Sequence, residues 1–241
     1  MGQGIERTTL TRLPHEFLDS SPMTVFLTGA SRGIGLSIHE KLSTMGYNII
    51  APPRSELNLA DISSITGYIE QHKQDPIDII INNAAINPTT PLGKMSPELI
   101  EEILRIDVIA PLLLTRGLTS HMKEESWGRI INISSIWGVR GREGRSVYST
   151  AKHALNGMTS SLARELGTYN ILVNSVCPGF IDTEMTRRNL SSEEIEVLLE
   201  RVPLGRLARP EEIANVVAFL ISKENTYLTG QSIVVDGGFT V

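Results

Sequence analysis

The stretch from Met23 to Gly35, MTVFLTGASRGIG, decides the fold of this chain. A short apolar run leads into three glycines at positions 29, 33 and 35, and the periodic stretch IGLSIHEKLSTMG continues from them. This order predicts a strand, a tight turn and a helix. Glycines let such a turn approach a pyrophosphate, whose charge is met by the N–H groups of the helix N-terminus. Turns use glycine anyway, so a plain strand–turn–helix unit is the alternative.

A second pattern lies in the middle of the chain. Tyr148 and Lys152, in YSTAK, follow Ser135 by 13 and 17 residues. Tyr148 and Lys152 are four residues apart, so on a helix they share one face about a turn from each other. The alternative for any YxxxK pattern is a surface helix with an amphipathic lysine.

These three residue types suit proton transfer at a carbonyl. A phenol titrates near ~10, so at neutral pH it donates a proton readily and acts poorly as a base unless a positive charge stabilises the phenolate. Lys152 supplies that charge, and Ser135 can hydrogen-bond the substrate oxygen. Together they are suited to protonating an alkoxide while a hydride arrives, or to the reverse reaction.

From about Met23 to Val241 the chain resembles the short-chain dehydrogenase/reductase family, and its tail from Val202 resembles the 3-oxoacyl-(acyl carrier protein) reductase branch. The matching segments are TGASRGIG at 28–35, NNAA at 82–85, Ser135, YSTAK at 148–152, CPGFIDT at 177–183 and LTGQSIVVDGG at 228–238. The resemblance implies an α/β fold: a Rossmann-type, doubly wound parallel sheet of about seven strands with helices on both faces. The alternation of strand and helix patterns without a linker predicts one domain over residues 23–241.

The resemblance also implies roles for individual residues. Ser135 would orient the carbonyl, Tyr148 would be the acid/base, and Lys152 would lower its pKa and hold the nicotinamide ribose. Tyr148 and Lys152 thus belong to both the catalytic and the cofactor site. The other cofactor-binding candidates are Gly29, Ser31, Arg32, Gly33, Ile34, Gly35, Arg54, Asn58, Leu59, Asn83, Ala84, Pro178, Gly179, Ile181 and Thr183.

The chain departs from the family pattern in three places. Asp107 stands where the family usually has an asparagine that joins a water relay to the lysine; the relay also uses the backbone carbonyl, so Asp107 remains a catalytic-site candidate. Ala85 replaces the last glycine of NNAG. The segment between Arg54 and Asn58 leaves no room for a helix that the family often has, which predicts an open adenine side.

The charges near the predicted cofactor site favour NADP(H). A site that prefers NAD places a carboxylate at the end of the second strand, whereas arginine meets a 2′-phosphate. The chain reads APPRSE there, with Pro52 at the acid's position, and Arg32 and Arg54 are within reach of the phosphate. Two solvated surface arginines are the alternative.

Composition limits the partners. A net charge of −5 gives no reason to expect a nucleic-acid or membrane partner, and no metal site is expected. The single cysteine, Cys177, is consistent with a reducing compartment, and we expect its thiol to be packed and unreactive. Residues 1–22 lack the apolar core of a signal peptide and read as a partly ordered arm. We expect a cytoplasmic protein, and the family resemblance suggests a homotetramer built through the long helices that carry Asp107 and Tyr148 and through the C-terminal strand.

The substrate is the least specified part. Arg140, Arg142 and Arg145 lie between Ser135 and Tyr148, where they would bind an anionic or sugar-type substrate, form a subunit contact or face solvent. Trp137 would stack on a substrate or pack. The segment after Thr183 starts polar, carries a cap-like Ser191 and continues as a helical pattern, as a lid or an ordinary amphipathic helix would.

Three readings of function follow. The first is an NADPH-dependent ketone/alcohol oxidoreductase acting on a small molecule, with a 3-oxoacyl thioester as the leading specific substrate. An acidic acyl carrier protein as partner meets an objection. Reductases that use it tend to be basic in the stretches that read KEESWGR and GTYN here, whereas this chain has Glu124, Glu125 and Ser126 in the first and Tyr169 in the second, and like charges would slow the encounter. The second is an enzyme for a free anionic carbonyl or sugar. The third is a cofactor-binding scaffold without turnover, against which the intact Ser135, Tyr148 and Lys152 speak.

Overall fold

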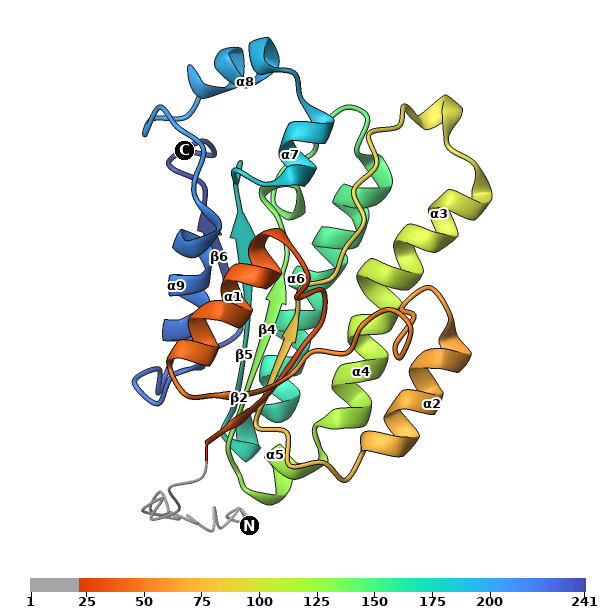
Figure 1. Cartoon of the computed structure of the whole chain (residues 1–241), viewed down its shortest axis with the longest axis vertical. Coiled ribbons are helices and arrows are strands. Elements are labelled where there is room, and N and C mark those ends of the chain that lie inside the picture. Colours follow the sequence, from red (N-terminus) through yellow and green to blue (C-terminus); the bar gives the residue numbers. More distant parts are fainter. Residues whose placement is uncertain (1–21) are drawn as a thin grey trace, which may run out of the picture.

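The computed structural model describes residues 22–241, and its centre is a parallel sheet covered by helices on both faces (Figure 1). Neighbouring strands are parallel, in the order β2-β1-β3-β4-β5-β6. The strands are β1 Thr24–Leu27, β2 Asn48–Ile50, β3 Ile79–Asn82, β4 Gly128–Ile133, β5 Ile171–Pro178 and β6 Ser232–Val235. The predicted α/β class with a doubly wound parallel sheet is confirmed.

Helices join successive strands and divide between the two faces. Helices α1 and α9 pack against each other on one face, and α2, α4 and α6 cover the other (Figure 1). The helices are α1 Gly33–Thr44, α2 Ile62–His72, α3 Pro97–Leu104, α4 Ala110–Leu118, α5 Ser120–Glu124, α6 Ser146–Leu166, α7 Glu184–Asn189, α8 Ser192–Leu199 and α9 Pro210–Ile221.

The core consists of two apolar layers, one on each face of the sheet. Successive side chains of a strand point to opposite faces. Val25 and Leu27 therefore pack with α1 and α9, whereas Phe26 between them packs with α2, α4 and α6. All three residues are fully buried. Strands covered on both faces need apolar residues at every position, which explains runs such as IIIN in β3.

The described residues form six strands where about seven were expected. Only residues 51–61 lie between β2 and α2, and they form turns. A further strand at this edge would need a crossover of a dozen or more residues after β2. Pro52 and Pro53 fix their own backbone and oppose a helix in this segment. The edge of the sheet beside β2 is therefore shorter than in the expected architecture.

The strand order reverses between β1 and β3. Chain order runs outward from β1 to β2 on one side and from β3 to β6 on the other. The loops that follow β1 and β3 leave toward opposite faces and open a crevice at the carboxyl ends of these strands. This point of reversal positions the site.

Three further expectations concern the N-terminal arm, membrane-spanning helices and the single cysteine. The arm predicted for residues 1–22 lies outside the described residues apart from Pro22. Within residues 22–241, no helix has the length and hydrophobicity that crossing a bilayer requires. Cys177 is buried in β5, and burial raises the pKa of its thiol, as expected for a packed cysteine.

Candidate active site

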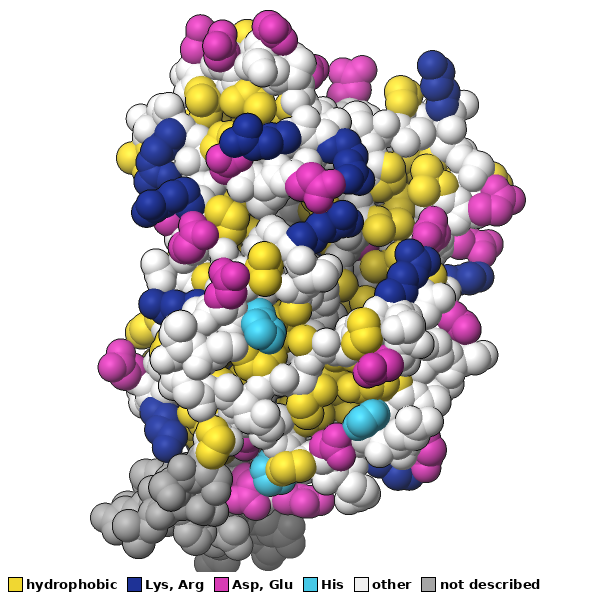
Figure 2. Space-filling view, viewed as in Figure 1, with side chains coloured by type: hydrophobic (Ala, Val, Ile, Leu, Met, Phe, Trp, Pro, Cys, Tyr) yellow, Lys and Arg dark blue, Asp and Glu magenta, His cyan; other side chains and the backbone are white. Residues whose placement is uncertain are grey.

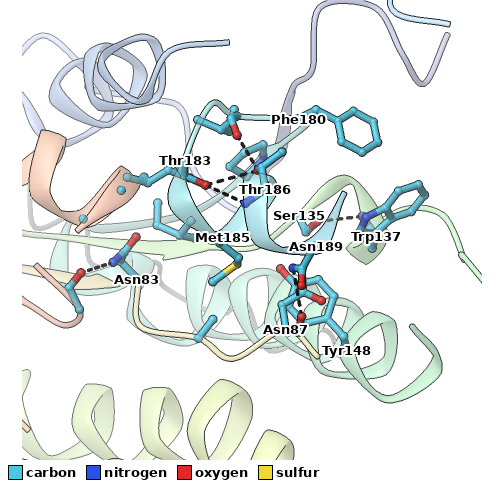
Figure 3. A pocket seen from close by; sticks show the side chains of 18 of the residues that line it. Asn83, Asn87, Ser135, Trp137, Tyr148, Phe180, Thr183, Met185, Thr186 and Asn189 are labelled. Carbon is cyan, nitrogen blue, oxygen red and sulfur yellow. Dashed lines mark hydrogen bonds between the residues drawn. The ribbon is translucent and has the colours of Figure 1, made fainter. Parts of the chain in front are cut away.

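A cavity of about 350 Å³ opens at the carboxyl ends of the central strands. Gly29 after β1, Asn83 after β3, Ser135 after β4 and Pro178 at the end of β5 all line it. Figure 3 shows Asn83 at one end of the cavity, Ser135 and Tyr148 at the other, and Met185 of α7 between them. The cavity thus extends from the glycine turn to Ser135 and Tyr148, across the point of strand reversal.

Ser135, Tyr148 and Lys152 meet at one end of this cavity, as their spacing predicts. Ser135 directly precedes the short helical turn Ile136–Gly138, and its Oγ accepts a hydrogen bond from the Trp137 N–H at 3.1 Å. Tyr148 and Lys152 lie in the first turns of α6, and the Lys152 ammonium is 5.4 Å from the centre of the Tyr148 ring. All three residues are buried.

The hydrogen-bonding environment fixes the lysine. Its Nζ donates to the Ile133 carbonyl at 3.1 Å, and its backbone carbonyl accepts from the Ser134 hydroxyl at 3.1 Å. Lys152 therefore connects the end of β4 to α6 at both of its ends. A buried ammonium held in this way has one position and needs a compensating charge.

Asp107 provides that charge. Its Oδ2 lies 3.4 Å from the Lys152 Nζ, and its Oδ1 accepts a hydrogen bond from the Ile86 N–H at 3.0 Å. Asp107 is fully buried in a π-helical turn, Arg105–Ile109, between α3 and α4. Pro111 has no N–H to donate to the Asp107 carbonyl four residues before it, so this carbonyl lacks its ordinary helical partner. The site thus contains a buried ion pair where the family pattern has an amide.

The pKa values follow from burial and from these charges. Burial raises the pKa of the Tyr148 phenol more than the Lys152 charge lowers it, and the Asp107 charge raises it further. The net effect is opposite to the lowering that Lys152 alone would produce. Burial lowers the pKa of Lys152, but the charges of Asp107 and Tyr148 outweigh burial and the net pKa is raised. Burial raises the pKa of Asp107 against the lowering effect of Lys152.

The opposite end of the cavity is formed by the glycine turn and the start of α1. Gly29 and Gly33 have φ values of +72° and +56°, which favour glycine. A Cβ on Gly35 would lie 2.0 Å from the Gly29 carbonyl oxygen, so only glycine lets α1 approach β1 this closely. Arg32, the N-cap of α1, makes no side-chain cap hydrogen bond. The first N–H groups of α1 thus face the cavity without a side-chain cap, which fits a pyrophosphate.

Asn83 and Ala84 close this end from β3. Their backbone N–H groups donate to the Thr28 hydroxyl at 3.0 and 3.1 Å, and the Asn83 amide donates to the carbonyls of Thr28 and Gly29 at 3.0 Å. The turn is therefore held from both strands. Pro178, Gly179, Ile181 and Thr183 also line the cavity, and their place beside the nicotinamide stays a prediction.

Three of the predicted cofactor residues do not line the cavity. Arg54 is exposed in the loop after β2. The Asn58 side-chain oxygen accepts a hydrogen bond from the Ala60 N–H at 3.2 Å, and Leu59 packs against the core layer under α2. Their roles toward a cofactor stay predictions. Of the two arginines considered for a 2′-phosphate, Arg32 alone lines the cavity.

Helix α7 lies over the cavity as a lid. Ser191 and Glu194 form a capping box that starts α8, so the predicted cap and helix are confirmed. Arg32 is 3.6 Å from Glu184 of α7, and the Asn189 amide donates to the Asn87 carbonyl at 3.5 Å. These contacts attach the lid to both walls. Figure 2 shows acidic side chains over α8 and basic ones over α7 below it.

The comparisons with known proteins agree with this geometry. The family model described as "Enoyl-(Acyl carrier protein) reductase" matches residues 56–240. The 3-oxoacyl-[acyl-carrier-protein] reductase FabG of Aquifex aeolicus is 40% identical over 237 residues, covering 88% of this chain and 95% of that protein. The chain belongs to the short-chain dehydrogenase/reductase family. It is an oxidoreductase of that family.

Solved structures of short-chain dehydrogenases/reductases match the fold over nearly the whole chain. A 4-hydroxyisoleucine dehydrogenase mutant complexed with NADH and succinate has a TM-score of 0.85 at 27% identity, covering 90% of this chain and 98% of that one. A blue fluorescent protein from a metagenomic library, in complex with NADPH, has a TM-score of 0.78 at 32% identity, covering 91% and 98%. The two structures contain different forms of the nicotinamide cofactor.

The sequence did not single out two polar residues at the Tyr148 end of the cavity of this short-chain dehydrogenase/reductase. Asn87 and Asn189 both line the cavity and face each other beside Tyr148 (Figure 3). The pair Asn87–Pro88 marks a turn, which indicates a loop and no ligand. Asn189 lies in a segment whose sequence predicted either a lid or an ordinary amphipathic helix. Only the hydrogen bond between Asn87 and Asn189 across the cavity identifies the two residues as part of the site.

Proposed function

We propose that this chain interconverts a ketone and a secondary alcohol with NADP(H), using Ser135, Tyr148 and Lys152. The observation that carries the proposal is their burial together at one end of a cavity whose other end is a glycine-lined helix N-terminus. A cavity of this kind places a carbonyl beside a proton donor and a dinucleotide along its length.

The proposed chemistry uses the raised pKa of Tyr148. A phenol that stays protonated at neutral pH is a proton donor, so Tyr148 delivers its proton to the substrate oxygen in the reductive direction. The Ser135 hydroxyl donates a hydrogen bond to the same oxygen and orients it. The ammonium of Lys152 stabilises the phenolate that remains. Reduced nicotinamide, when bound, supplies the hydride to the carbonyl carbon.

The cofactor would lie along the cavity with its pyrophosphate at α1. Gly29, Ser31, Gly33, Ile34 and Gly35 would meet the pyrophosphate, Asn83 and Ala84 would line the cofactor trough beside them, and Lys152 would hold the nicotinamide ribose. We expect NADPH to bind more tightly than NADH, because Pro52 stands where an NAD site would have a carboxylate and Arg32 is available to a 2′-phosphate. Side-by-side dissociation constants test this expectation, and tighter binding of NADH would contradict it.

Asp107 would act through Lys152 as a positioning residue. It does not line the cavity, but it holds the lysine that the chemistry needs and keeps the phenol protonated. The ion pair in place of the usual amide therefore keeps Tyr148 in its protonated form to higher pH, and this form is the one that a reduction uses.

Two substrate classes are supported by separate observations. The name of the Aquifex aeolicus relative supports a 3-oxoacyl thioester. The stretches that argued against an acidic carrier, at Glu124 and Tyr169, lie before β4 and β5 and so at the end of the sheet away from the cavity (Figure 1). The charge of these stretches would affect the binding of an acyl carrier protein only if the bound carrier reached a neighbouring subunit. The arginine-containing loop before Tyr148 supports the second class, a free anionic carbonyl compound or sugar.

A cytoplasmic homotetramer is the assembly we propose. The exposed apolar side chains Ile109 and Leu112 on and beside α4, and the outer edge of β6 with Val234, offer two faces for association. Light scattering at working concentration tests this assembly, and a monomer would contradict it.

The decisive experiment measures NADPH oxidation with an acetoacetyl thioester, presented on a pantetheine mimic and on acyl carrier protein. The Tyr148→Phe variant serves as control and should lose roughly 10²–10⁴-fold in rate while it retains cofactor binding. Faster turnover on the carrier supports the thioester role. Undiminished turnover by Tyr148→Phe would refute the proposed chemistry. A wild-type protein that binds NADPH but reduces no carbonyl would instead support the alternative function of a cofactor-binding scaffold.

A further inference from the structure

The three arginines between Ser135 and Tyr148 have different environments. The Arg140 guanidinium donates to the Thr240 carbonyl near the C-terminus and does not line the cavity. Arg142 and Arg145 both line it, at the end that holds Tyr148. The structure therefore selects two of the three arginines as candidates for a ligand.

Arg145 is buried and anchored. Its guanidinium donates to the Asn87 carbonyl at 2.7 Å and to the Asn87 side-chain oxygen, and its Nε has no hydrogen-bond partner among the described residues. Burial lowers the pKa of Arg145, and the charge of Arg142 lowers it further. The two guanidinium groups are thus close enough to repel each other.

Arg142 is half-buried and rests on an aromatic platform. Its guanidinium carbon is 5.3 Å from the centre of the Trp137 ring. Trp137 in turn packs edge-on against Phe180 and Phe239, with ring centres 6.0 Å apart in both cases. A guanidinium held over an aromatic ring keeps its N–H groups directed outward in the ring plane and free to bind.

The charges in the cavity do not balance at this end. Its ionisable lining residues, besides Tyr148, are Arg32, Arg142, Arg145, Lys152 and Glu184. Lys152 is neutralised by Asp107, and Glu184 pairs with Arg32 and Arg188 of the lid region. Within residues 22–241, no carboxylate forms an ion pair with Arg142 or Arg145. Two uncompensated positive charges in a concave site favour an anion.

We propose that the substrate is a free ketone or alcohol that carries a carboxylate, and that Arg142 binds this carboxylate while the carbonyl lies between Ser135 and Tyr148. Arg145, whose Nη1 donates to Asn87, adds a second positive charge at this end of the cavity. The inference rests on the proposed function of the same site and names its substrate class. A planar guanidinium pairs with a carboxylate through two parallel hydrogen bonds, which also fixes the distance from the carboxylate to the carbonyl.

Equilibrium binding to the NADP⁺-loaded protein tests this assignment independently of turnover. Acetoacetate and its neutral methyl ester are titrated calorimetrically into wild type, Arg142→Gln and Arg140→Gln, the last being the matched loss of charge outside the cavity. We expect wild type and Arg140→Gln to bind the acid at least about 10-fold more tightly than the ester, and Arg142→Gln to lose that preference. Equal binding of acid and ester by wild type, or an unchanged ratio in Arg142→Gln, would overturn the proposal.

A second pair of ligands separates carboxylate from phosphate. Dihydroxyacetone phosphate and dihydroxyacetone are compared in the same proteins, and a preference that depends on Arg142 and is confined to the phosphate would overturn the assignment to a carboxylate. NADPH oxidation then separates this inference from the proposed function. Acetoacetate that binds through Arg142 without being reduced refutes the function alone, whereas reduction of the ester or thioester in preference to the acid refutes the inference alone.

Discussion

The glycine turn and the lid, α7, are attached to the rest of the cavity wall by different kinds of contact. At the glycine turn, backbone meets backbone: a Cβ on Gly35 would lie 2.0 Å from the Gly29 carbonyl oxygen and 2.4 Å from the Asn83 amide nitrogen. At the lid, α7 is attached through side chains, with Arg32 3.6 Å from Glu184 and both side chains more than half exposed. Exposed ion pairs contribute only about 0–1 kcal/mol.

This difference separates a rigid end from an adjustable one. Backbone contacts leave no room for substitution, so the end proposed to hold the cofactor tolerates little change. Long, exposed side chains exchange partners at low energetic cost, so the lid and the arginine-containing loop can vary with the substrate. Ser135, Tyr148 and Lys152 lie at the end of the cavity opposite the glycine turn, and Lys152 depends on a buried ion pair with Asp107. Substitutions at the four positions below should rank accordingly.

The largest effect is expected for Gly35→Ala. The new methyl group would overlap backbone atoms that cannot move independently of β1, so we expect failure to fold or a loss of more than about 5 kcal/mol in stability. Thermal unfolding and NADPH titration measure it. The control is Gly67→Ala in α2, where a Cβ meets nothing within 4 Å and helix propensity should stabilise by about 1 kcal/mol. Equal stabilities would show that the glycine turn is not rigid.

A smaller loss is expected for Asp107→Ala. Removing one partner leaves the Lys152 ammonium buried and unpaired, which costs about 3–5 kcal/mol. Chemical denaturation measures this loss. A stability equal to wild type would show that Lys152 finds another partner.

The conservative variant Asp107→Asn tests the charge separately, through pH. The raised pKa of Tyr148 keeps the phenol protonated, so wild-type reduction should persist up to pH values above the ordinary value near ~10. Asp107→Asn removes a charge that raises this pKa, so the decline in reductive kcat/KM should move to lower pH. Activity profiles across pH 6–11 measure both curves. Coincident profiles would mean that Asp107 does not act through Tyr148.

At the substrate end, Arg145→Met should have an intermediate effect. It removes the hydrogen bonds to Asn87, and bonds that involve a charged group contribute about 1.5–3 kcal/mol. The loop after β3 should loosen, which hydrogen exchange at residues 85–90 would detect. Arg140→Met, in the same loop but outside the cavity, is the matched control. Similar exchange in the two variants would contradict an anchoring role.

The smallest effect is expected for Glu184→Gln at the lid. It releases Arg32 from an exposed pair, so stability should change by less than about 1 kcal/mol. NADPH should bind about 2–5-fold more tightly, because Arg32 no longer has to leave the Glu184 carboxylate before it pairs with the 2′-phosphate. Fluorescence titration measures the affinity at two salt concentrations. Weaker binding of NADPH would show that Glu184 supports the site.

Much of the site could be predicted from local patterns. The glycine spacing predicted the turn and α1, and Ser135, Tyr148 and Lys152 meet as their spacing predicted. These features depend on residues within a few turns of one another, or on strand ends that a parallel sheet brings to one edge. The absence of a carboxylate after β2 was likewise readable in the sequence.

The exact strand count and the side-chain partners were not predictable in the same way. The expected count of about seven strands came from resemblance, whereas the turns at residues 51–61 leave six in the described part. The Asn87 carbonyl accepts from Arg145, 58 residues away, and from Asn189, 102 residues away. No spacing rule specifies such pairs.

The sequence by itself determined the α/β sheet, the glycine turn and the three candidate catalytic residues, because short-range periodicity and backbone conformation encode them. The tertiary structure alone decided that Arg140 binds near the C-terminus while Arg142 and Arg145 line the cavity, and that Asp107 pairs with Lys152. Long side chains reach in several directions, and which partner each one finds depends on burial and charge contributed by distant segments.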